Sequence, residues 1–166
     1  MDKIKQKLLT DKNLSILRKK FSSKKIGLVH GVFDFFHYGH LLHIEKAKSL
    51  CDILVVSITS DKFIKKGIGR PFYNNFQRKK ILSSLIQINY LYVSESESSV
   101  ELINKLKPDI YFKGNDYVNF KKDYSKKIIK EADAVKKNNG KIIFTNEKTF
   151  SSTKLINNYS ENLDEE

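Results

Sequence analysis

The sequence predicts an α/β fold built on a doubly wound, five-stranded parallel sheet. Short apolar runs of strand length alternate with longer segments in which apolar residues recur at helical spacing. One run, Ile53–Thr59, is almost wholly apolar, which is typical of a strand buried on both faces of a sheet. Strands that alternate with helices require right-handed crossovers, and these place helices on both faces of a parallel sheet.

Several of the predicted elements have recognisable ends. Pro108 disfavours helical geometry in the residue before it, so the helix that precedes it ends near Leu106. Asn138-Asn139-Gly140 closes the next helix, because Asn and Gly adopt the left-handed conformation common after a helix. A polar, glycine-bearing loop covers residues 60–74. The expected order is strand Ile26–His30, helix Tyr38–Leu50, strand Ile53–Thr59, helix Asn75–Gln87, strand Tyr90–Val93, helix Ser98–Leu106, strand Ile110–Phe112, helix Tyr124–Lys137, strand Lys141–Phe144 and helix Ser151–Tyr159.

The chain has 166 residues, enough for one domain with a substantial core. We expect residues 1–24 to form an N-terminal helical extension and residues 25–159 to form the functional domain. The acidic residues 160–166 are expected to be a disordered tail.

The composition restricts the cellular context. No apolar run approaches the roughly 20 residues that a membrane-spanning helix needs. The segment Met1–Lys12 is charged and lacks the apolar stretch of a signal peptide. The single cysteine, Cys51, excludes an intramolecular disulfide. We therefore expect a cytoplasmic protein with no membrane partner.

The net charge of +12 at pH 7 by itself suits a nucleic-acid-binding protein. However, only three of the 31 basic residues are arginines, and the excess of Lys, Asn and Ile is that of an AT-rich coding sequence. No basic run is interleaved with aromatic residues as in a base-stacking platform. We expect no nucleic-acid partner, while a positive field still attracts small polyanions such as nucleotides.

All four histidines lie between His30 and His43. His37 and His40 are three residues apart, so both face the same way on a helix that begins near Tyr38. A helix N-terminus already favours an anion, and Gly39 lets a phosphate approach the backbone closely. One histidine capping the helix is the alternative interpretation, whereas His30 and His43 are expected to have structural or supporting roles.

Polar side chains follow most of the predicted strands. Because the carboxyl ends of parallel strands meet at one edge of the sheet, these residues are expected to lie close together. Cations, hydroxyl groups and glycines in such a cluster indicate a polyphosphate site. The residues concerned are Asp34, His37 and His40 after the first strand, Ser60, Asp61, Lys65 and Lys66 after the second, Lys113-Gly114-Asn115-Asp116-Tyr117 after the fourth, and Ser151-Ser152-Thr153 after the fifth.

Three of these groups also have simpler interpretations. Lys65 and Lys66 suit a solvated loop, and Ser151-Ser152-Thr153 suits a helix cap. Asp116 and Tyr117 suit ordinary turn chemistry. Only their joint order favours a functional role.

The stretch after the first strand runs Gly31-Val32-Phe33-Asp34-Phe35-Phe36-His37-Tyr38-Gly39-His40. It resembles the H-x-G-H signature of the nucleotidyltransferase superfamily that includes the cytidylyltransferases, whose fold is Rossmann-like. The likeness covers roughly residues 26–157 and continues through Ser60-Asp61, Arg70-Pro71, Gln77-Arg78, Lys113-Gly114-Asn115-Asp116-Tyr117 and Ser151-Ser152-Thr153.

Within the superfamily, two branches resemble this chain. The Lys113–Tyr117 stretch is similar to one in the adenylyltransferase domain of bacterial ADP-heptose synthases. Glycerol-3-phosphate cytidylyltransferases come second, because their Arg-Thr-(acid)-Gly run is replaced here by Asn146–Thr149, which has no arginine. The resemblance implies transfer of NMP from an NTP, with ATP favoured, to a sugar phosphate, with release of pyrophosphate.

The resemblance also implies roles for individual residues. Mg²⁺ would accompany the NTP, held largely by its phosphates and water, and the resemblance implies no dedicated protein metal site. Asp34 would serve substrate or metal binding, and Arg78 either phosphate binding or loop bracing. A homodimer is the expected assembly. The implied residues are His37, His40 and Lys66 for catalysis, Gly31, Val32, Phe33, Gly39, Lys113, Gly114, Ser151, Ser152 and Thr153 for nucleotide binding, and Asp34, Asp61, Arg78, Asp116 and Tyr117 for substrate binding.

Two rival functions remain open at this point. A CTP-dependent enzyme acting on glycerol 3-phosphate or a similar alcohol phosphate would use the same catalytic residues with a different base pocket. A non-catalytic nucleotide- or nucleic-acid-binding protein is the rival from another class. The presence of both His37 and His40 argues against it, because a site without catalysis has no chemical need for the pair.

Overall fold

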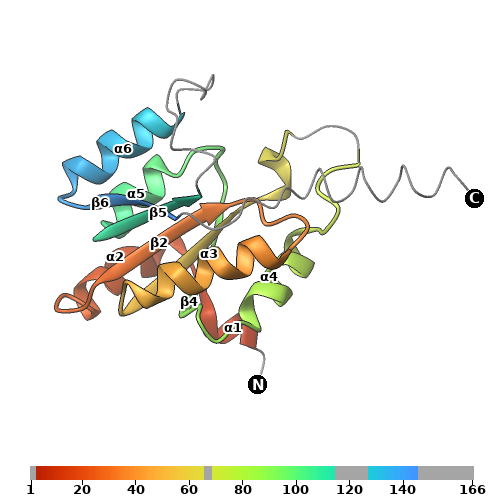
Figure 1. Cartoon of the computed structure of the whole chain (residues 1–166), viewed down its shortest axis with the longest axis horizontal. Coiled ribbons are helices and arrows are strands. Elements are labelled where there is room, and N and C mark those ends of the chain that lie inside the picture. Colours follow the sequence, from red (N-terminus) through yellow and green to blue (C-terminus); the bar gives the residue numbers. More distant parts are fainter. Residues whose placement is uncertain (1–2, 66–68, 115–126, 146–166) are drawn as a thin grey trace, which may run out of the picture.

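The computed structural model describes residues 3–65, 69–114 and 127–145. These residues form six strands, all parallel, in the order β1-β4-β3-β2-β5-β6 (Figure 1). The strands are β1 (Leu8–Leu9), β2 (Ile26–Gly31), β3 (Ile53–Thr59), β4 (Tyr90–Ser94), β5 (Ile110–Gly114) and β6 (Lys141–Thr145). The helices are α1 (Lys3–Lys7), α2 (Asp11–Lys20), α3 (Tyr38–Ser49), α4 (Asn75–Ser83), α5 (Val100–Leu106) and α6 (Lys127–Lys137), with a 3₁₀ turn at Asp61–Phe63.

The sheet has one strand more than the five predicted. The N-terminal segment was expected to be helical throughout, but Leu8 and Leu9 form β1 and pair with Leu91 and Tyr92 of β4. A two-residue strand shows no periodicity, so the sequence pattern did not reveal it. It covers one edge of β4 and buries Leu9 against the core. The predicted domain boundaries at residues 24 and 159 stay predictions.

The five predicted strands are confirmed, with ends that shift by one or two residues. The structure extends β5 to Gly114 and begins α5 at Val100. The helix predicted to reach Gln87 ends at Ser83. After α6 the left-handed residue is Asn139, with a φ of 60°, and the Gly140 N–H donates to the Val135 carbonyl. The predicted helix Ser151–Tyr159 lies outside the described residues.

Helices cover both faces of the sheet and enclose two apolar clusters. Helices α2, α5 and α6 pack over the face that carries Leu28 and Tyr111. Helices α3 and α4 pack over the opposite face, which carries Val29 and Phe112. Successive strand residues alternate between these faces, so each strand contributes to both clusters.

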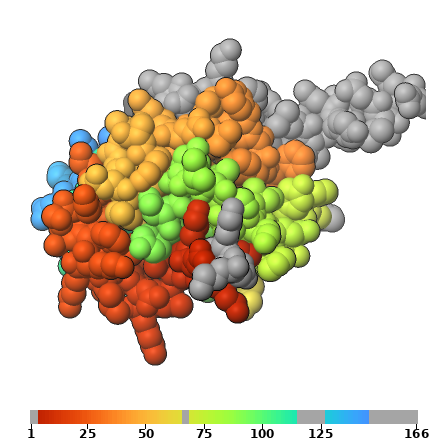
Figure 2. Space-filling model, turned by 90° about the horizontal axis from the view of Figure 1, so that it is seen from below, coloured from red at the N-terminus to blue at the C-terminus, as the bar shows by residue number. Residues whose placement is uncertain are grey.

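The N-terminal segment also braces the α3/α4 side of the molecule. In Figure 2 the red N-terminal residues lie against the yellow-green surface around α4. The Lys7 ammonium donates a hydrogen bond to the Leu85 carbonyl at 2.7 Å. The added strand and helices therefore belong to the same packed unit as the sheet.

Candidate functional site

The candidate site lies at the carboxyl edge of the sheet, where β2 leads into α3. His37 is the residue before the first turn of α3 and has an extended backbone, and His40 lies in that first turn. The His37 backbone N–H donates to Nδ1 of His40 at 3.4 Å. The two imidazole rings stack with centroids 3.8 Å apart and planes 19° from parallel. The predicted pairing of the histidines at a helix N-terminus is therefore present in the structure.

The electrostatic setting of this pair suits an anion. Gly39 lies in the first turn of α3, where backbone N–H groups and the positive end of the helix favour an anion. Burial lowers the pKa of His37, so its ring is neutral at pH 7 and can donate a hydrogen bond through one nitrogen. A neutral donor at a helix N-terminus can bind a phosphate without adding a full charge.

Aromatic side chains hold His40 in place. Its ring packs against Phe33, with centroids 5.1 Å apart, and against Phe36 at 5.6 Å. Phe33 has a φ of 52°, in the left-handed region that non-glycine residues seldom occupy. A Cβ at Gly31 would lie 3.1 Å from the Phe33 ring, so glycine at this position leaves room for that ring. Gly31 and Phe33 thus shape the turn that presents the histidines.

Asp34 connects this turn to the loop before α4. The side chain is buried, and its Oδ2 accepts a hydrogen bond from the Arg70 guanidinium at 2.7 Å. Its Oδ1 accepts from the Tyr73 backbone N–H at 3.0 Å. Both carboxylate oxygens therefore accept hydrogen bonds from the loop before α4. These contacts support a role for Asp34 in bracing that loop.

Arg78 is the centre of a second brace. Its side chain is fully buried, and all five N–H donors of a guanidinium are engaged. They bond to Tyr73 O at 3.0 Å, Val32 O at 2.7 Å, Thr59 O at 2.8 Å, Asp61 Oδ1 at 2.5 Å and Asn75 Oδ1 at 2.7 Å. Of the two roles implied for Arg78, these contacts support loop bracing. Asp61 is part of the same brace, because its Oδ2 accepts a hydrogen bond from the Asn75 backbone N–H at 2.9 Å.

Lys113 lies on the other face of the sheet from α3. It alternates with Phe112 along β5, and its ammonium pairs with Glu131 of α6 at 2.8 Å. Glu131 also accepts hydrogen bonds from the Ser99 backbone N–H and the Tyr111 hydroxyl. Burial works to raise the pKa of Glu131, but the Lys113 ammonium and these hydrogen bonds outweigh it and hold the pKa below its usual value. The structure does not bring the Lys113 side chain to the histidine pair.

Sequence reasoning missed Glu131, although a signal was available. Glu131 is three residues after Ile128 and four before Val135, so it interrupts the buried face of α6. A carboxylate at a core position indicates a buried partner.

The other two histidines each contact the hydroxyl group of a neighbouring element. His43 of α3 and Thr145 at the end of β6 have Nδ1 and Oγ1 2.7 Å apart. His30 of β2 and Ser57 of β3 have Nδ1 and Oγ 3.1 Å apart. Burial lowers the pKa of each imidazole to about 4, and the Lys113 ammonium acts in the same direction. Both rings are therefore neutral at pH 7.

Several predicted site residues cannot be placed. Lys66, Asp116, Tyr117, Ser151, Ser152 and Thr153 lie outside the described residues. Gly114 ends β5, opposite Thr145 of β6. Lys65 is described, and its ammonium pairs with Glu97, which also holds Lys127.

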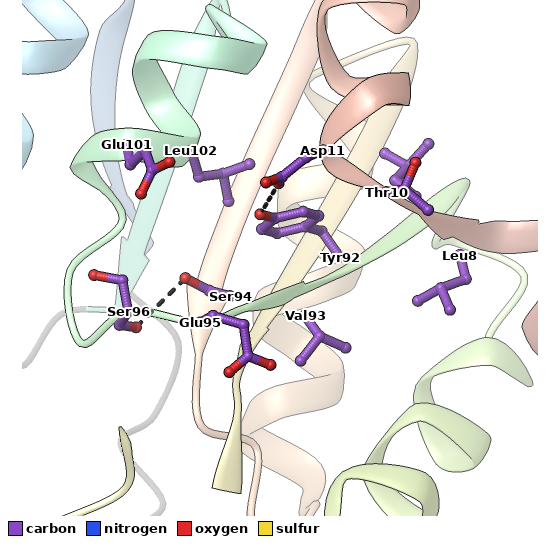
Figure 3. Close-up of a pocket in the computed structure, with 11 residues that line it drawn as sticks. Leu8, Thr10, Asp11, Tyr92, Val93, Ser94, Glu95, Ser96, Glu101 and Leu102 are labelled. Carbon is purple, nitrogen blue, oxygen red and sulfur yellow. Dashed lines mark hydrogen bonds between the residues drawn. The ribbon is translucent and has the colours of Figure 1, made fainter. Parts of the chain in front are cut away.

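A separate pocket of about 350 Å³ lies at the sheet edge where β1 meets β4 (Figure 3). The Tyr92 hydroxyl donates to Asp11 across this pocket, and the Ser94 hydroxyl donates to the Ser96 carbonyl. Lys105 pairs with both Asp11 and Glu101. Most of the polar side chains here already have hydrogen-bond or ion-pair partners within the protein, so we assign the pocket no role in the candidate site.

The residues near the histidine pair do not fit a protein-held metal. Both oxygens of Asp34 and both of Asp61 already accept hydrogen bonds from protein groups. In the described parts of the chain, no group of three or more potential side-chain ligands surrounds a common point.

Across residues 3–65, 69–114 and 127–145, no helix has the length and apolar character needed to cross a membrane.

Curated proteins with the name bifunctional protein HldE are similar in sequence to this chain. A bifunctional protein HldE of Campylobacter jejuni subsp. doylei is 39% identical over 145 residues, which are 86% of this chain and 29% of that protein. One from Helicobacter pylori is 45% identical over 98 residues, 58% of this chain and 21% of that protein. The chain thus spans less than a third of the length of these curated relatives.

Solved structures extend the likeness of fold. The lipopolysaccharide core biosynthesis protein of Thermoplasma volcanium has a TM-score of 0.62 at 21% identity, covering 76% of this chain and 99% of that one. Pantoate-beta-alanine ligase of Francisella tularensis has a TM-score of 0.55 at 18% identity, covering 84% and 66%. The profile of the cytidylyltransferase-like family matches residues 28–158. With that match over most of its length, and with the histidine pair in place at the start of α3, the chain belongs to the cytidylyltransferase-like family.

Proposed function

We propose that this chain is a nucleotidyltransferase that transfers NMP from an NTP to a sugar phosphate and releases pyrophosphate. The observation that carries the proposal is the stacked His37–His40 pair at the N-terminus of α3. Family membership supports this reaction class, and the neutral donor beside the first helix N–H groups suits a nucleotide phosphate.

The reaction needs no protein nucleophile. A phosphate oxygen of the acceptor attacks the α-phosphorus, a new P–O–P bond forms, and the bond to the departing pyrophosphate breaks. Catalysis then consists of holding the two substrates in line and stabilising the negative charge on the transferred group. His37, His40 and the first N–H groups of α3 supply hydrogen bonds for that charge. The braces at Asp34 and Arg78 keep the loops around them in place.

Further residues enter through the family resemblance. Lys66 would contact the phosphates from its loop, and Ser151, Ser152 and Thr153 would bind the triphosphate. Asp116 and Tyr117 would contact the substrate. Lys113 would act through its strand, because its ammonium is paired with Glu131. Mg²⁺ would enter as the Mg–NTP complex.

Within this reaction we propose ATP as the nucleotide and a hexose or heptose 1-phosphate as the acceptor. The relatives that support this choice carry the name bifunctional protein HldE, and the sequence resembles the adenylyltransferase domain of ADP-heptose synthases. A pocket that hydrogen-bonds the base edge leaves buried groups unpaired with the wrong base, at about 1–3 kcal/mol each. We therefore expect at least about tenfold preference for ATP over CTP in kcat/KM.

A pyrophosphate-release screen tests the proposal. Each of the four NTPs is combined with Mg²⁺ and with a panel of sugar 1-phosphates and polyol phosphates. Release with ATP and a sugar 1-phosphate is expected. Release only with CTP and a polyol phosphate would move the enzyme to the cytidylyltransferase branch. No release with any pair, together with a salt-sensitive mobility shift on polynucleotide, would favour a binding protein and contradict catalysis.

The assembly and location of the protein are also proposals. We propose a homodimer in the cytoplasm, with no nucleic-acid partner. Light scattering at several protein concentrations measures the molar mass, and a monomer throughout would contradict the dimer.

A further inference from the structure

The contact between His43 and Thr145 crosses two elements that are distant in the sequence. His43 lies one turn after His40 on α3, and Thr145 is the last residue of β6, 102 positions later. Nδ1 of His43 and Oγ1 of Thr145 are 2.7 Å apart. Thr145 is 2% exposed, and its hydroxyl also donates to the Lys113 carbonyl of β5 at 3.5 Å. The contact thus links α3, β6 and β5.

Either atom of the contact between His43 and Thr145 can be the donor. We assign the single hydroxyl proton of Thr145 to the Lys113 carbonyl, which can only accept. The Thr145 oxygen then accepts from His43, which places the proton of the neutral imidazole on Nδ1 and leaves Nε2 unprotonated. Burial supports the neutral form by lowering the pKa of His43 to about 4.

This contact constrains α3 in a way that its apolar packing does not. Ile44 and Ala47 pack on the sheet through non-directional contacts, which allow a helix to rotate or slide slightly. A buried hydrogen bond of 2.7 Å is directional and costly to break. His40 and His43 are three residues apart on the same helix face, so fixing one orients the other.

We propose that His43 is a positioning residue for the nucleotide site, which acts by holding the His40 turn of α3 in register with the end of β6. The proposal rests on the proposed function, in which His40 contacts nucleotide phosphates. From Thr145 the chain continues toward the Ser151-Ser152-Thr153 motif assigned to the triphosphate. The bond therefore joins α3 to the strand that precedes this motif in the sequence.

The chain offers a matched control. His30 and Ser57 form another buried histidine–hydroxyl pair, with a similarly lowered pKa, between β2 and β3. These two strands are already joined by a continuous ladder from Ile26 to Gly31. Loss of the Ser57 hydroxyl therefore removes a bond of the same kind without releasing a helix.

The test compares Thr145→Val and His43→Leu, alone and combined, with the conservative variants Thr145→Ser and His43→Asn. Calorimetry gives Kd for Mg–ATP, and steady-state kinetics give kcat and KM. Each disruptive variant is expected to weaken ATP binding and lower kcat by about five- to tenfold, the scale of one buried hydrogen bond. The double variant should be no worse than either single one, because both remove the same bond. Thr145→Ser and His43→Asn should recover most of the loss, since Ser keeps the hydroxyl and the Asn amide can take the place of Nδ1–H.

Comparing the free energy of unfolding with the Kd for ATP separates positioning from simple stability. Ser57→Ala should lower the free energy of unfolding and leave the Kd for ATP unchanged. If Thr145→Val and His43→Leu lower only the free energy of unfolding and leave Kd and kcat unchanged, the inference is overturned. Wild-type protein that binds no NTP would overturn the proposed function and this inference with it, whereas normal binding in every variant overturns only the inference.

The protonation state provides a readout independent of activity. Long-range ¹H–¹⁵N correlation spectra of the full chain should show the His43 proton on Nδ1 and an unprotonated Nε2. Thr145→Val should abolish this preference. A proton on Nε2 in the wild-type protein would contradict the hydrogen-bond direction on which the proposal is built.

Discussion

The buried ion pair between Lys113 and Glu131 provides the most informative test of the structure. The side chains are 8% and 4% exposed, and their charged atoms are 2.8 Å apart. Removing one charge leaves the other buried without its partner. We therefore expect Glu131→Gln to lower the free energy of unfolding by about 3 kcal/mol, at the lower end of the usual 3–5 kcal/mol for such a break. The lower value is expected because the glutamine side chain keeps an oxygen that can accept from the Ser99 N–H.

The double variant Lys113→Met with Glu131→Gln should be far less damaging. Neutral, well-packed replacements for a buried ion pair are often neutral or stabilising, because neither charge then has to be desolvated. We expect the double variant to recover most of the loss of Glu131→Gln. The coupling energy between the two positions should be about 2–3 kcal/mol.

Urea denaturation followed by circular dichroism at pH 7 measures these differences. The exposed Lys105–Glu101 pair on α5 is the matched control, since its members are 35% and 70% exposed. The same pair of replacements there should give a coupling of about 0.3–0.5 kcal/mol. Additive effects at Lys113 and Glu131 would refute the reasoning that the pair is buried and mutually dependent.

The same variants address the role of Lys113 in the reaction. If Lys113 acts only through the ion pair, the double variant keeps its KM for ATP. A large increase in KM despite restored stability would mean that the ammonium contacts the nucleotide. The pH dependence gives a further check, because the pKa of Glu131 is lowered in the folded protein. Its contribution to stability is present above the unfolded value of about 4.5 and is lost as the pH falls through the lowered folded value.

Four further outcomes are expected. His40→Ala should lower kcat by about two orders of magnitude with an unchanged melting temperature, and near-full activity in a pyrophosphate-release assay would contradict the mechanism. Lys66→Ala should slow turnover without loss of stability, and if turnover is unaffected the residue belongs to a solvated loop. Arg78→Met should cost about 3 kcal/mol or more in urea denaturation, because buried carbonyls lose their donor, and a smaller cost would argue against the brace. Since the pKa values of His30 and His43 are depressed to about 4, their unfolded forms take up protons first as the pH falls below 6.5. The free energy of unfolding should decrease by about 3 kcal/mol per histidine between pH 6.5 and pH 4. If the double variant His30→Asn with His43→Asn shows the same dependence of this free energy on pH as the wild type, the reasoning is contradicted.

The sequence by itself determined the alternation of elements and the location of the histidine pair. Ile53–Thr59 carries an apolar run long enough to define a buried strand, and its predicted limits match those of β3. The spacing of His37 and His40 places both on one helix face, because helical periodicity is a local property of the chain. The strands β2 to β6 were predictable for the same reason, because each has enough residues to show the apolar pattern of a strand.

Only the tertiary structure decided which polar residues are braces. Asp34 and Asp61 follow predicted strands, and Arg78 lies in a predicted helix. The resemblance implied substrate binding for these residues, and it left loop bracing open only for Arg78. Their partners, such as Val32 and Thr59 for Arg78, come from other elements of the chain and cannot be inferred from local patterns. The face on which Lys113 lies and its pairing with Glu131 likewise depend on how α6 packs over β5. Local periodicity determines elements, whereas the partner of a buried charge is set by packing between elements far apart in the chain.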